Sequence, residues 1–460
     1  MPVEGRGLSW KQTQEVTKTE GLVMSLATPE SVQKLQTALH DKAKKSPDFR
    51  FYSLYDKVYR KDVLTFAYEC SKANGGVAGV DNETFEDIEA YGEERWLNEL
   101  MQKLRSQTYQ PLPVRRVYIP KPGGKQRPLG IPAIRDRAVM MAAVLVLDPI
   151  FEADLQPEQY AYRRDRSALD AVRRVFKLIN TGHREIVDAD LASYFDLLPH
   201  AELLKSVARR VVDGAMLHLI KMWLTAPVEE TDERGRKHRG TRNRDQGRGT
   251  PQGSPISPLL SNLYMRRFVL GWKKLGHEER LGACIVNYAD DLVICCRSRA
   301  EEALATMRSM MTKLKLTVNE TKTRVATLPE EKFDFLGYTF GRCYSIKTGR
   351  AYLGTAPSKT RVIRICNAIS DETGRNRTSL DHKTVVTKLN QMMNGWANYF
   401  CLGSASKAYR AIELHACKRL RQWLCTKHKV SWPAFGRFPH ESLHTTFGLV
   451  RLTQRTRSFS

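Results

Sequence analysis

The sequence predicts an α+β fold, because strand-like and helical patterns both recur along the chain. Runs rich in β-branched and other apolar residues at 184–190, 284–287 and 292–296 are typical of strands. Apolar residues at three-to-four spacing within 32–39 and 96–104 are typical of helices. With 460 residues and 42% hydrophobic content, the chain is long enough to form roughly two to four domains with a real core.

Two adjacent carboxylates stand at the tip of a predicted β-hairpin, in the tetrapeptide Tyr288-Ala289-Asp290-Asp291. Mg²⁺ binds one or two carboxylates together with substrate phosphate oxygens, so acidic side chains on a rigid hairpin suit two-metal phosphoryl transfer. Ordinary solvated turns also contain adjacent aspartates. The tetrapeptide alone therefore leaves both interpretations open.

A third carboxylate, Asp190, ends the run 184–190, after which the chain turns towards a helix. Carboxylates at the ends of neighbouring strands would complete a metal site. Asp188 lies two residues earlier on the same face of the predicted strand. A slip of two residues would therefore exchange the roles of Asp188 and Asp190.

From this point the chain resembles the reverse transcriptases encoded by group II introns. The first catalytic block of that family reads Asp, three variable residues, two aromatics and Asp, which Asp190 to Asp196 match. The match favours Asp190 over Asp188. The resemblance implies a right-hand polymerase with fingers, palm and thumb. It also implies that Asp190 and Asp290 bind Mg²⁺ directly, that Asp291 supports them, and that Phe195 lies under the sugar and excludes a 2′-hydroxyl.

Four further blocks follow the order of that family. Residues 118–132 resemble its fingers hairpin, in which Lys121 and Arg127 would hold the triphosphate of the incoming nucleotide; an ordinary basic hairpin is the alternative. Residues 249–260 are the most specific stretch, with Gln252 expected to touch the nucleotide and the glycines expected to let backbone approach it. A Pro/Gly loop before a helix explains the composition but not the full string.

Lys322 in the block 319–323 matches a lysine near the pyrophosphate that would serve as general acid. Residues 333–340 resemble the hairpin that grips the primer end, although an aromatic-rich strand is more often simply core. Weaker matches at 135–137 and 162–167 correspond to blocks that contact template and nucleotide.

Charge indicates a polyanionic partner. The chain has 74 Lys and Arg against 50 Asp and Glu, a formal net charge of +24, and the last 120 residues hold 21 of the basic residues against 5 acidic ones. That segment is therefore predicted to bind nucleic acid. The basic loop 232–242 fits a solvated hairpin tip and an RNA contact equally well.

The C-terminal part is predicted to form thumb-like helices from Ser358 onwards. Its last long helix has an apolar face and a basic back. The apolar positions are Tyr409, Ile412, Ala416, Leu420 and Trp423, and the basic ones are Arg410, Lys418, Arg419, Arg421 and Lys427. The string 394–400 resembles the maturase region that binds intron RNA, with Trp396 and Tyr399 expected to anchor the core rather than stack on RNA.

The expected organisation is an N-terminal extension (1–30), a helical extension of the fingers (31–110), fingers (111–185), palm (186–345), thumb or maturase domain (346–430) and a short basic, DNA-binding C-terminal segment (431–460). No CxxC pair appears among the nine cysteines, which are expected to be reduced structural thiols rather than zinc ligands. The nuclease domain of the longest family members is expected to be absent. No targeting or membrane segment is evident, so a cytosolic, nucleoid-associated protein is expected.

The expected function is RNA-directed DNA synthesis from dNTPs with Mg²⁺, copying a group II intron RNA at a DNA target during retrohoming. The same protein would form a ribonucleoprotein with the intron RNA and assist its splicing. Two alternatives remain: a domesticated reverse transcriptase in DNA repair or phage defence, and an RNA-binding splicing factor with a decayed palm. The intact aspartates speak against the second alternative.

Overall fold

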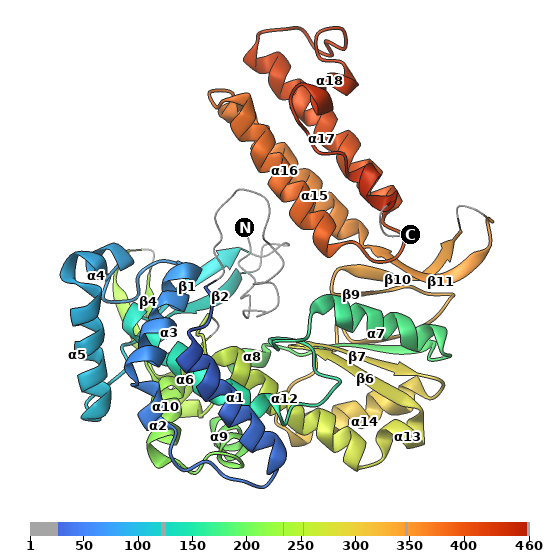
Figure 1. Cartoon of the computed structure of the whole chain (residues 1–460). Helices are drawn as coiled ribbons and strands as arrows, with labels where there is room; N and C mark the ends of the chain where they lie inside the picture. Colours follow the sequence, from blue (N-terminus) through green and yellow to red (C-terminus); the bar gives the residue numbers. More distant parts are fainter. Residues whose placement is uncertain (1–25, 121–125, 233, 252, 346–347, 458–460) are drawn as a thin grey trace. The chain divides into compact units, whose positions relative to one another are not determined.

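A computed structural model describes residues 26–120, 126–232, 234–251, 253–345 and 348–457 (Figure 1). The chain forms two compact units. Unit 1 comprises the described residues up to Ser167, together with Ala189–Leu292 and Glu301–Arg324. Unit 2 comprises Ala168–Asp188, Val293–Ala300 and the described residues from Val325 onwards.

Unit 1 opens with helices packed around α6 (Ile134–Glu152), which is buried along most of its length. Both α1 and α3 pack against α6 (Figure 1). The helices before α6 are α1 (Glu30–Lys45), α2 (Tyr55–Val58), α3 (Lys61–Asn74), α4 (Phe85–Tyr91) and α5 (Glu93–Arg105). Thr84 starts α4 with a reciprocal capping box to Asp87, which satisfies two backbone N–H groups that lack helical partners. The helices expected within 31–110 are therefore present.

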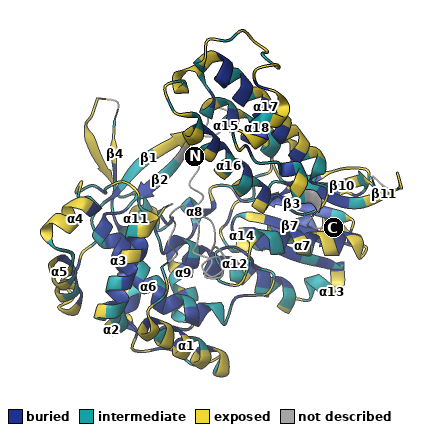
Figure 2. Cartoon of the chain, turned by 45° about the horizontal axis from the view of Figure 1, so that its top comes forward, coloured by how far each residue is buried: buried dark blue, intermediate teal, exposed yellow. Residues whose placement is uncertain are grey.

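A four-stranded sheet of order β2-β1-β4-β5 follows in unit 1. Its strands are β1 (Val114–Pro120), β2 (Gln126–Ile131), β4 (Val228–Thr231) and β5 (Lys237–Gly240). β1 and β2 pair antiparallel, with Arg116 opposite Gly130, and form the hairpin predicted at 118–132. β4 and β5 form a hairpin whose tip lies within the basic loop 232–242, and every residue of β5 is exposed (Figure 2).

A second four-stranded sheet has the order β6-β7-β3-β8. Its strands are β3 (Glu185–Asp190), β6 (Ala283–Tyr288), β7 (Asp291–Cys296) and β8 (Arg324–Thr327). The remaining helices of unit 1 are α8 (Tyr194–Leu197), α9 (His200–Ala208), α10 (Gly214–Thr225), α11 (Arg242–Gln246), α12 (Ser257–Lys274), α13 (His277–Leu281) and α14 (Ala300–Lys313), the last of which begins one residue before unit 1 resumes. The predicted strands at 184–190, 284–287 and 292–296 are all confirmed.

Unit 2 contains a three-stranded sheet of order β11-β10-β9 and three long helices that pack side by side (Figure 1). Its elements are α7 (Ala168–Asn180), β9 (Phe333–Phe335), β10 (Tyr338–Tyr344), β11 (Ala351–Pro357), α15 (Lys359–Glu372), α16 (His382–Tyr399), α17 (Ser406–Lys427), α18 (His440–Thr445) and the 3₁₀ helices Arg375–Arg377 and Leu452–Arg457. Ser358 stands immediately before α15, as predicted.

The three long helices share one apolar core that includes every residue of the apolar face predicted on α17. Trp396 packs against this core, and the Tyr399 hydroxyl donates a hydrogen bond to the Leu336 carbonyl 2.9 Å away, so both aromatics anchor the fold. The prediction that Arg421 lies on the solvent-facing back of α17 is wrong. Arg421 is buried, and its Nε donates to the Phe438 carbonyl at 2.8 Å.

No helix within the described ranges combines the length and the apolarity needed to cross a bilayer.

Candidate active site

One oxygen of the Asp190 carboxylate is held by two side chains from a single loop. Asn319 Nδ2 donates to Asp190 Oδ2 at 2.8 Å, and Lys322 Nζ donates to the same oxygen at 3.0 Å. The Asp190 side chain is 26% exposed and that of Lys322 is 64% exposed. Hydrogen bonds to a charged acceptor are stronger than neutral ones, so these two contacts fix the orientation of the carboxylate.

Main-chain hydrogen bonds bring this loop to the end of β3. Asn319 N donates to the Asp190 carbonyl at 2.8 Å, and Ala192 N donates to the Thr317 carbonyl at 2.9 Å. The Thr321 hydroxyl donates to Asn319 Oδ1 at 2.8 Å, which orients the amide so that its NH₂ group faces Asp190. Sequence reasoning singled out Lys322 but missed Asn319. The only feature of the sequence that could have indicated Asn319 is its place as the first residue of the block 319–323, which contains Lys322.

Asp290 lies in the two-residue connection between β6 and β7, and Asp291 is the first residue of β7. Ala289 has a φ of 57°, which closes this tight turn. The fully buried Asn287 supports the turn, because its Nδ2 donates to the Ala289 carbonyl at 2.9 Å and to the Asp291 carbonyl at 3.3 Å. The predicted hairpin and its aspartate tip are confirmed. Asn287 was not recognised from the sequence, because a buried asparagine at a strand end resembles any polar turn residue.

Asp290 is half-buried and Asp291 is exposed. Burial raises the pKa of the Tyr194 hydroxyl well above its ordinary value, and the nearby Tyr264 and Asp290 add to the rise. Tyr194 lies in the segment after β3, four residues beyond Asp190. Because Asp290 affects the pKa of Tyr194, Asp290 lies near this segment. The preference for Asp290 over Asp291 as the partner of Asp190 rests on the sequence match and remains a prediction.

Phe195 is 8% exposed, and its ring meets the Tyr194 ring edge-on with centroids 5.7 Å apart. Its carbonyl accepts a hydrogen bond from Thr250 N at 2.8 Å. This bond joins the block after Asp190 to the loop 249–256. The two segments that matched the family most specifically are therefore adjacent.

The glycines of that loop allow close approach to protein backbone. Gly249 has a φ of +100°, and a Cβ there would lie 3.1 Å from the Asp196 carbonyl oxygen. Gly253 has a φ of +107°, and a Cβ there would lie 2.6 Å from the Gly130 carbonyl oxygen of β2. A side chain would be strained and obstructed at both positions. The loop is consequently clamped between α8 and the β1–β2 hairpin.

Three predicted nucleotide contacts have no described side chain. Lys121 and Gln252 lie outside the described residues. Arg127 lies in β2, opposite Ile119, but its side chain is also outside the described part. Their roles remain predictions.

The weaker matches at 135–137 and 162–167 include residues with internal structural roles, and their contacts with template and nucleotide remain predictions. Asp136 is 1% exposed and accepts hydrogen bonds from the Tyr109 hydroxyl at 2.6 Å and from Leu112 N at 3.0 Å. Burial raises the pKa of Asp136 to about 6. Arg137 is buried and donates to the Pro132 carbonyl, and the buried Arg163 pairs with Glu152 at 2.6 Å. These side chains stabilise unit 1.

Carboxylate oxygens are the ligands that Mg²⁺ prefers, so the chemistry of Asp190, Asp290 and Asp291 fits that ion. Within the described part of the chain, one group of three possible metal ligands has its ligand atoms all within 4.8 Å of one another. It consists of Cys417, His440 and His444 in unit 2. The donor set of the three aspartates therefore fits Mg²⁺, while the assignment of Asp190 and Asp290 as direct ligands and of Asp291 as their support rests on the sequence match and remains a prediction.

Comparison with known proteins agrees with this geometry. Residues 119–340 match the family described as reverse transcriptase (RNA-dependent DNA polymerase), and residues 363–438 match the maturase-specific domain of group II introns. The chain thus combines a reverse transcriptase domain with a maturase-specific domain of the group II intron type.

Relatives of this intron-type protein include Protein YkfC of Escherichia coli (strain K12), which is 36% identical over 52% of this chain and 61% of that protein. The group II intron-encoded protein LtrA of Lactococcus lactis subsp. cremoris is 32% identical over 48% of this chain and 36% of LtrA. The chain thus spans less than two thirds of each relative. A telomerase structure from Candida albicans with a fragment of telomeric RNA has a TM-score of 0.40 at 12% identity, covering 78% of this chain and 70% of that chain.

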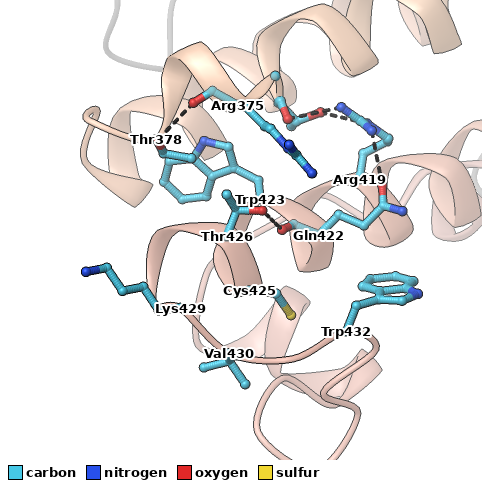
Figure 3. A pocket seen from close by; sticks show the side chains of 12 residues that line it. Arg375, Thr378, Arg419, Gln422, Trp423, Cys425, Thr426, Lys429, Val430 and Trp432 are labelled. Atoms are coloured by element: carbon cyan, nitrogen blue, oxygen red, sulfur yellow. Dashed lines mark hydrogen bonds between the residues drawn. The ribbon is translucent and has the colours of Figure 1, made fainter.

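The maturase-type part of unit 2 contains a basic hollow of ≈ 420 Å³ between the end of α15 and the end of α17 (Figure 3). Arg375 and Lys429 line it and are exposed, and Trp432 is 47% exposed. Trp423 also lines it, and its buried indole N–H has no hydrogen-bond partner among the described residues. The hollow therefore offers two cations and an exposed aromatic face.

Two basic residues predicted to face RNA are instead tied into the fold near this hollow. Arg419 donates to the carbonyls of Ser370 at 2.9 Å and Thr373 at 3.0 Å, which caps the end of α15. Lys427 Nζ donates to the carbonyls of Thr378 at 3.0 Å and Leu380 at 2.8 Å. Reversing their charge would disturb folding as well as any RNA contact.

Proposed function

We propose that this protein is an RNA-directed DNA polymerase that also binds its intron RNA and assists splicing. The observation that carries the polymerase proposal is the Asp190 carboxylate, which ends a strand and is held by Asn319 and Lys322 from a loop paired with that strand. In this proposal the β1–β2 hairpin belongs to the fingers. The sheet with β3, β6 and β7 is the palm, and α15, α16 and α17 form the thumb.

Asp190 and Asp290 would hold Mg²⁺, with Asp291 in support. The bound metal would activate the primer 3′ oxygen and neutralise charge that develops on the phosphates. Asn319 and Lys322 hold Oδ2 of Asp190, so the carboxylate enters each reaction cycle in one orientation. Preorganised ligands avoid a cost of reorientation during the reaction.

Lys322 brings an exposed ammonium group to the edge of this site. Positive charge there would stabilise the departing pyrophosphate, and Nζ carries a proton that it can donate to the leaving oxygen. Lys121 and Arg127 are assigned to the triphosphate, Gln252 to the nascent pair and Phe195 to the sugar, on the strength of the sequence match. Phe195 belongs next to Thr250 in this scheme, through their main-chain hydrogen bond.

RNA binding is assigned to unit 2, which contains most of the excess positive charge. The exposed cations Arg375 and Lys429 suit phosphate contacts, and the exposed face of Trp432 suits stacking on a base.

The proposal is tested by separating the two activities in purified protein. Asp290→Asn keeps the size of the side chain but removes its charge, so we expect primer extension on an RNA template to fall by at least about 100-fold, more than 2.7 kcal/mol of barrier. Binding to intron RNA should change less than about twofold, because that surface lies in other residues. Extension by the variant at the wild-type rate would refute the assignment of the active site.

A further inference from the structure

A cysteine and two histidines meet in the C-terminal part of unit 2, outside the proposed polymerase site. Cys417 lies on α17, and His440 and His444 lie one turn apart on α18. One ligand atom from each residue falls within 4.8 Å of the other two. Histidines four residues apart on a helix lie on the same face, so both rings can address one ion.

The local hydrogen bonds prepare this cluster for a metal. His444 Nδ1 lies 2.8 Å from the Leu449 carbonyl oxygen, which can only accept, so Nδ1 carries the proton of the neutral ring. The lone pair of Nε2 then points to Cys417 Sγ, 3.4 Å away. Histidine ligands of metals are commonly fixed by such a bond from the second ring nitrogen to a carbonyl.

The three side chains of the cluster differ in burial, and the side of the cluster at His440 is open to solvent. Cys417 is 2% exposed and His444 is 9% exposed, whereas His440 is exposed to solvent. The two inner ligands are therefore shielded, and a fourth ligand can reach the ion from the side of His440. Three protein ligands and one from solvent make a four-coordinate zinc site.

Charges around the cluster are mixed. Burial raises the pKa of the Cys417 thiol to about 12, and the buried Glu413 one turn earlier adds to the rise. Arg421 and Arg451 act in the opposite direction; Arg451 pairs with Glu441, and Arg421 donates to the Phe438 carbonyl. Without a metal the thiol keeps its proton, and a bound dication would replace that proton and release it to water.

We propose that Cys417, His440 and His444 bind one Zn²⁺ ion, which joins α18 to α17. One thiolate and two imidazoles are ligands that suit zinc. The residues that follow α18 contribute Leu449 and Leu452 to the core of unit 2, so an ion at this position would fix the last described segment against α17. The site is independent of the polymerase assignment.

The test uses the full-length protein, purified without a histidine tag and stripped with a chelator, then titrated with Zn²⁺. Wild type should take up about one zinc per chain. His440→Ala removes an exposed ligand, so the protein should stay folded while zinc affinity falls by about 100-fold or more. Cys417→Ala should abolish uptake, whereas Cys425→Ala, which removes another buried cysteine of α17, should leave uptake intact.

Co²⁺ supplies a second readout, because a thiolate–cobalt charge-transfer band reports a sulfur ligand. The band should appear in wild type and Cys425→Ala and be missing from Cys417→Ala. Failure of wild type to bind zinc, or uptake that is equal in wild type and His440→Ala, would overturn the proposal. The cluster would then be an ordinary buried hydrogen bond between cysteine and histidine.

Discussion

Removing the amide of Asn319 should impair polymerisation without unfolding the protein. Its Nδ2 donates to Asp190 Oδ2 at 2.8 Å, and hydrogen bonds to charged groups contribute about 1.5–3 kcal/mol. If that contribution is expressed fully in the transition state, Asn319→Ala should lower the rate of single-nucleotide addition by about 10- to 100-fold. Asn319 is only half-buried, so the loss of its side chain should leave little cavity.

Two further variants should lower the rate by different amounts. Thr321→Val removes the hydroxyl that orients Asn319 and should cost about 0.5–1.5 kcal/mol, or roughly 2- to 10-fold in rate. Asn319→Asp places a second carboxylate beside Asp190. At an effective dielectric constant of about 20, the repulsion at 2.8 Å is at most about 6 kcal/mol, which the partly exposed position and Lys322 reduce.

The assay is rapid-quench primer extension on an RNA template at saturating dNTP and Mg²⁺, with the melting temperature and the affinity for intron RNA measured in parallel. The expected order of rates is wild type, Thr321→Val, Asn319→Ala and Asn319→Asp. If Asn319→Ala adds nucleotides within about twofold of the wild-type rate, its hydrogen bond to Asp190 has no part in catalysis.

Three other outcomes are expected. Phe195→Val should raise ribonucleotide incorporation relative to deoxyribonucleotide incorporation. Valine is chosen because truncating this buried ring to Ala would cost about 3–5 kcal/mol of stability. An unchanged ratio in competitive extension would assign the sugar contact to another residue. Because the pKa of Asp136 is raised to about 6 in the folded protein, its contribution to stability is present below the unfolded pKa near 3.8 and is lost as pH rises through about 6. Denaturant unfolding should accordingly show wild type losing about 1–3 kcal/mol relative to Asp136→Asn between pH 4 and pH 7, and a difference independent of pH would contradict the raised pKa. In unit 2, Arg375→Gln combined with Lys429→Gln should reduce the slope of log affinity for RNA against log salt by about two, and a wild-type slope would remove these cations from the RNA surface.

Local patterns predicted many of the strands and hairpins correctly. The β6–β7 hairpin, the end of β3 at Asp190 and the β1–β2 hairpin all follow from apolar runs and turn residues that act over a few positions. Asn319 could not be predicted in the same way. Its role depends on pairing between segments 129 residues apart, which sequence spacing does not encode.

The environment of individual arginines could not be read from the sequence. Arg137, Arg163 and Arg421 lie in basic stretches that resemble nucleic-acid contacts, yet each is buried with carbonyl or carboxylate partners. An arginine has five donors, so it can satisfy several backbone carbonyls inside a fold. Net charge indicates the class of partner, whereas burial decides which cations are available to it.

The glycines at 249 and 253 have the conformational freedom that the sequence predicted, whereas their approach to the nucleotide stays a prediction. Both have positive φ and permit close approach, as the sequence suggested. The groups that approach are backbone carbonyls of Asp196 and Gly130. The loop is therefore built by contacts within the protein before any nucleotide binds.

We assign catalysis to the carboxylate that Asn319 and Lys322 hold at the end of β3. Asp188 and Asp190 lie two residues apart in β3, so Asp188→Asn and Asp190→Asn are matched changes of charge within one strand. Single-nucleotide extension by the two purified variants should show at least about a 100-fold loss for Asp190→Asn and less than about a threefold change for Asp188→Asn. Extension that survives in Asp190→Asn and fails in Asp188→Asn would contradict the account.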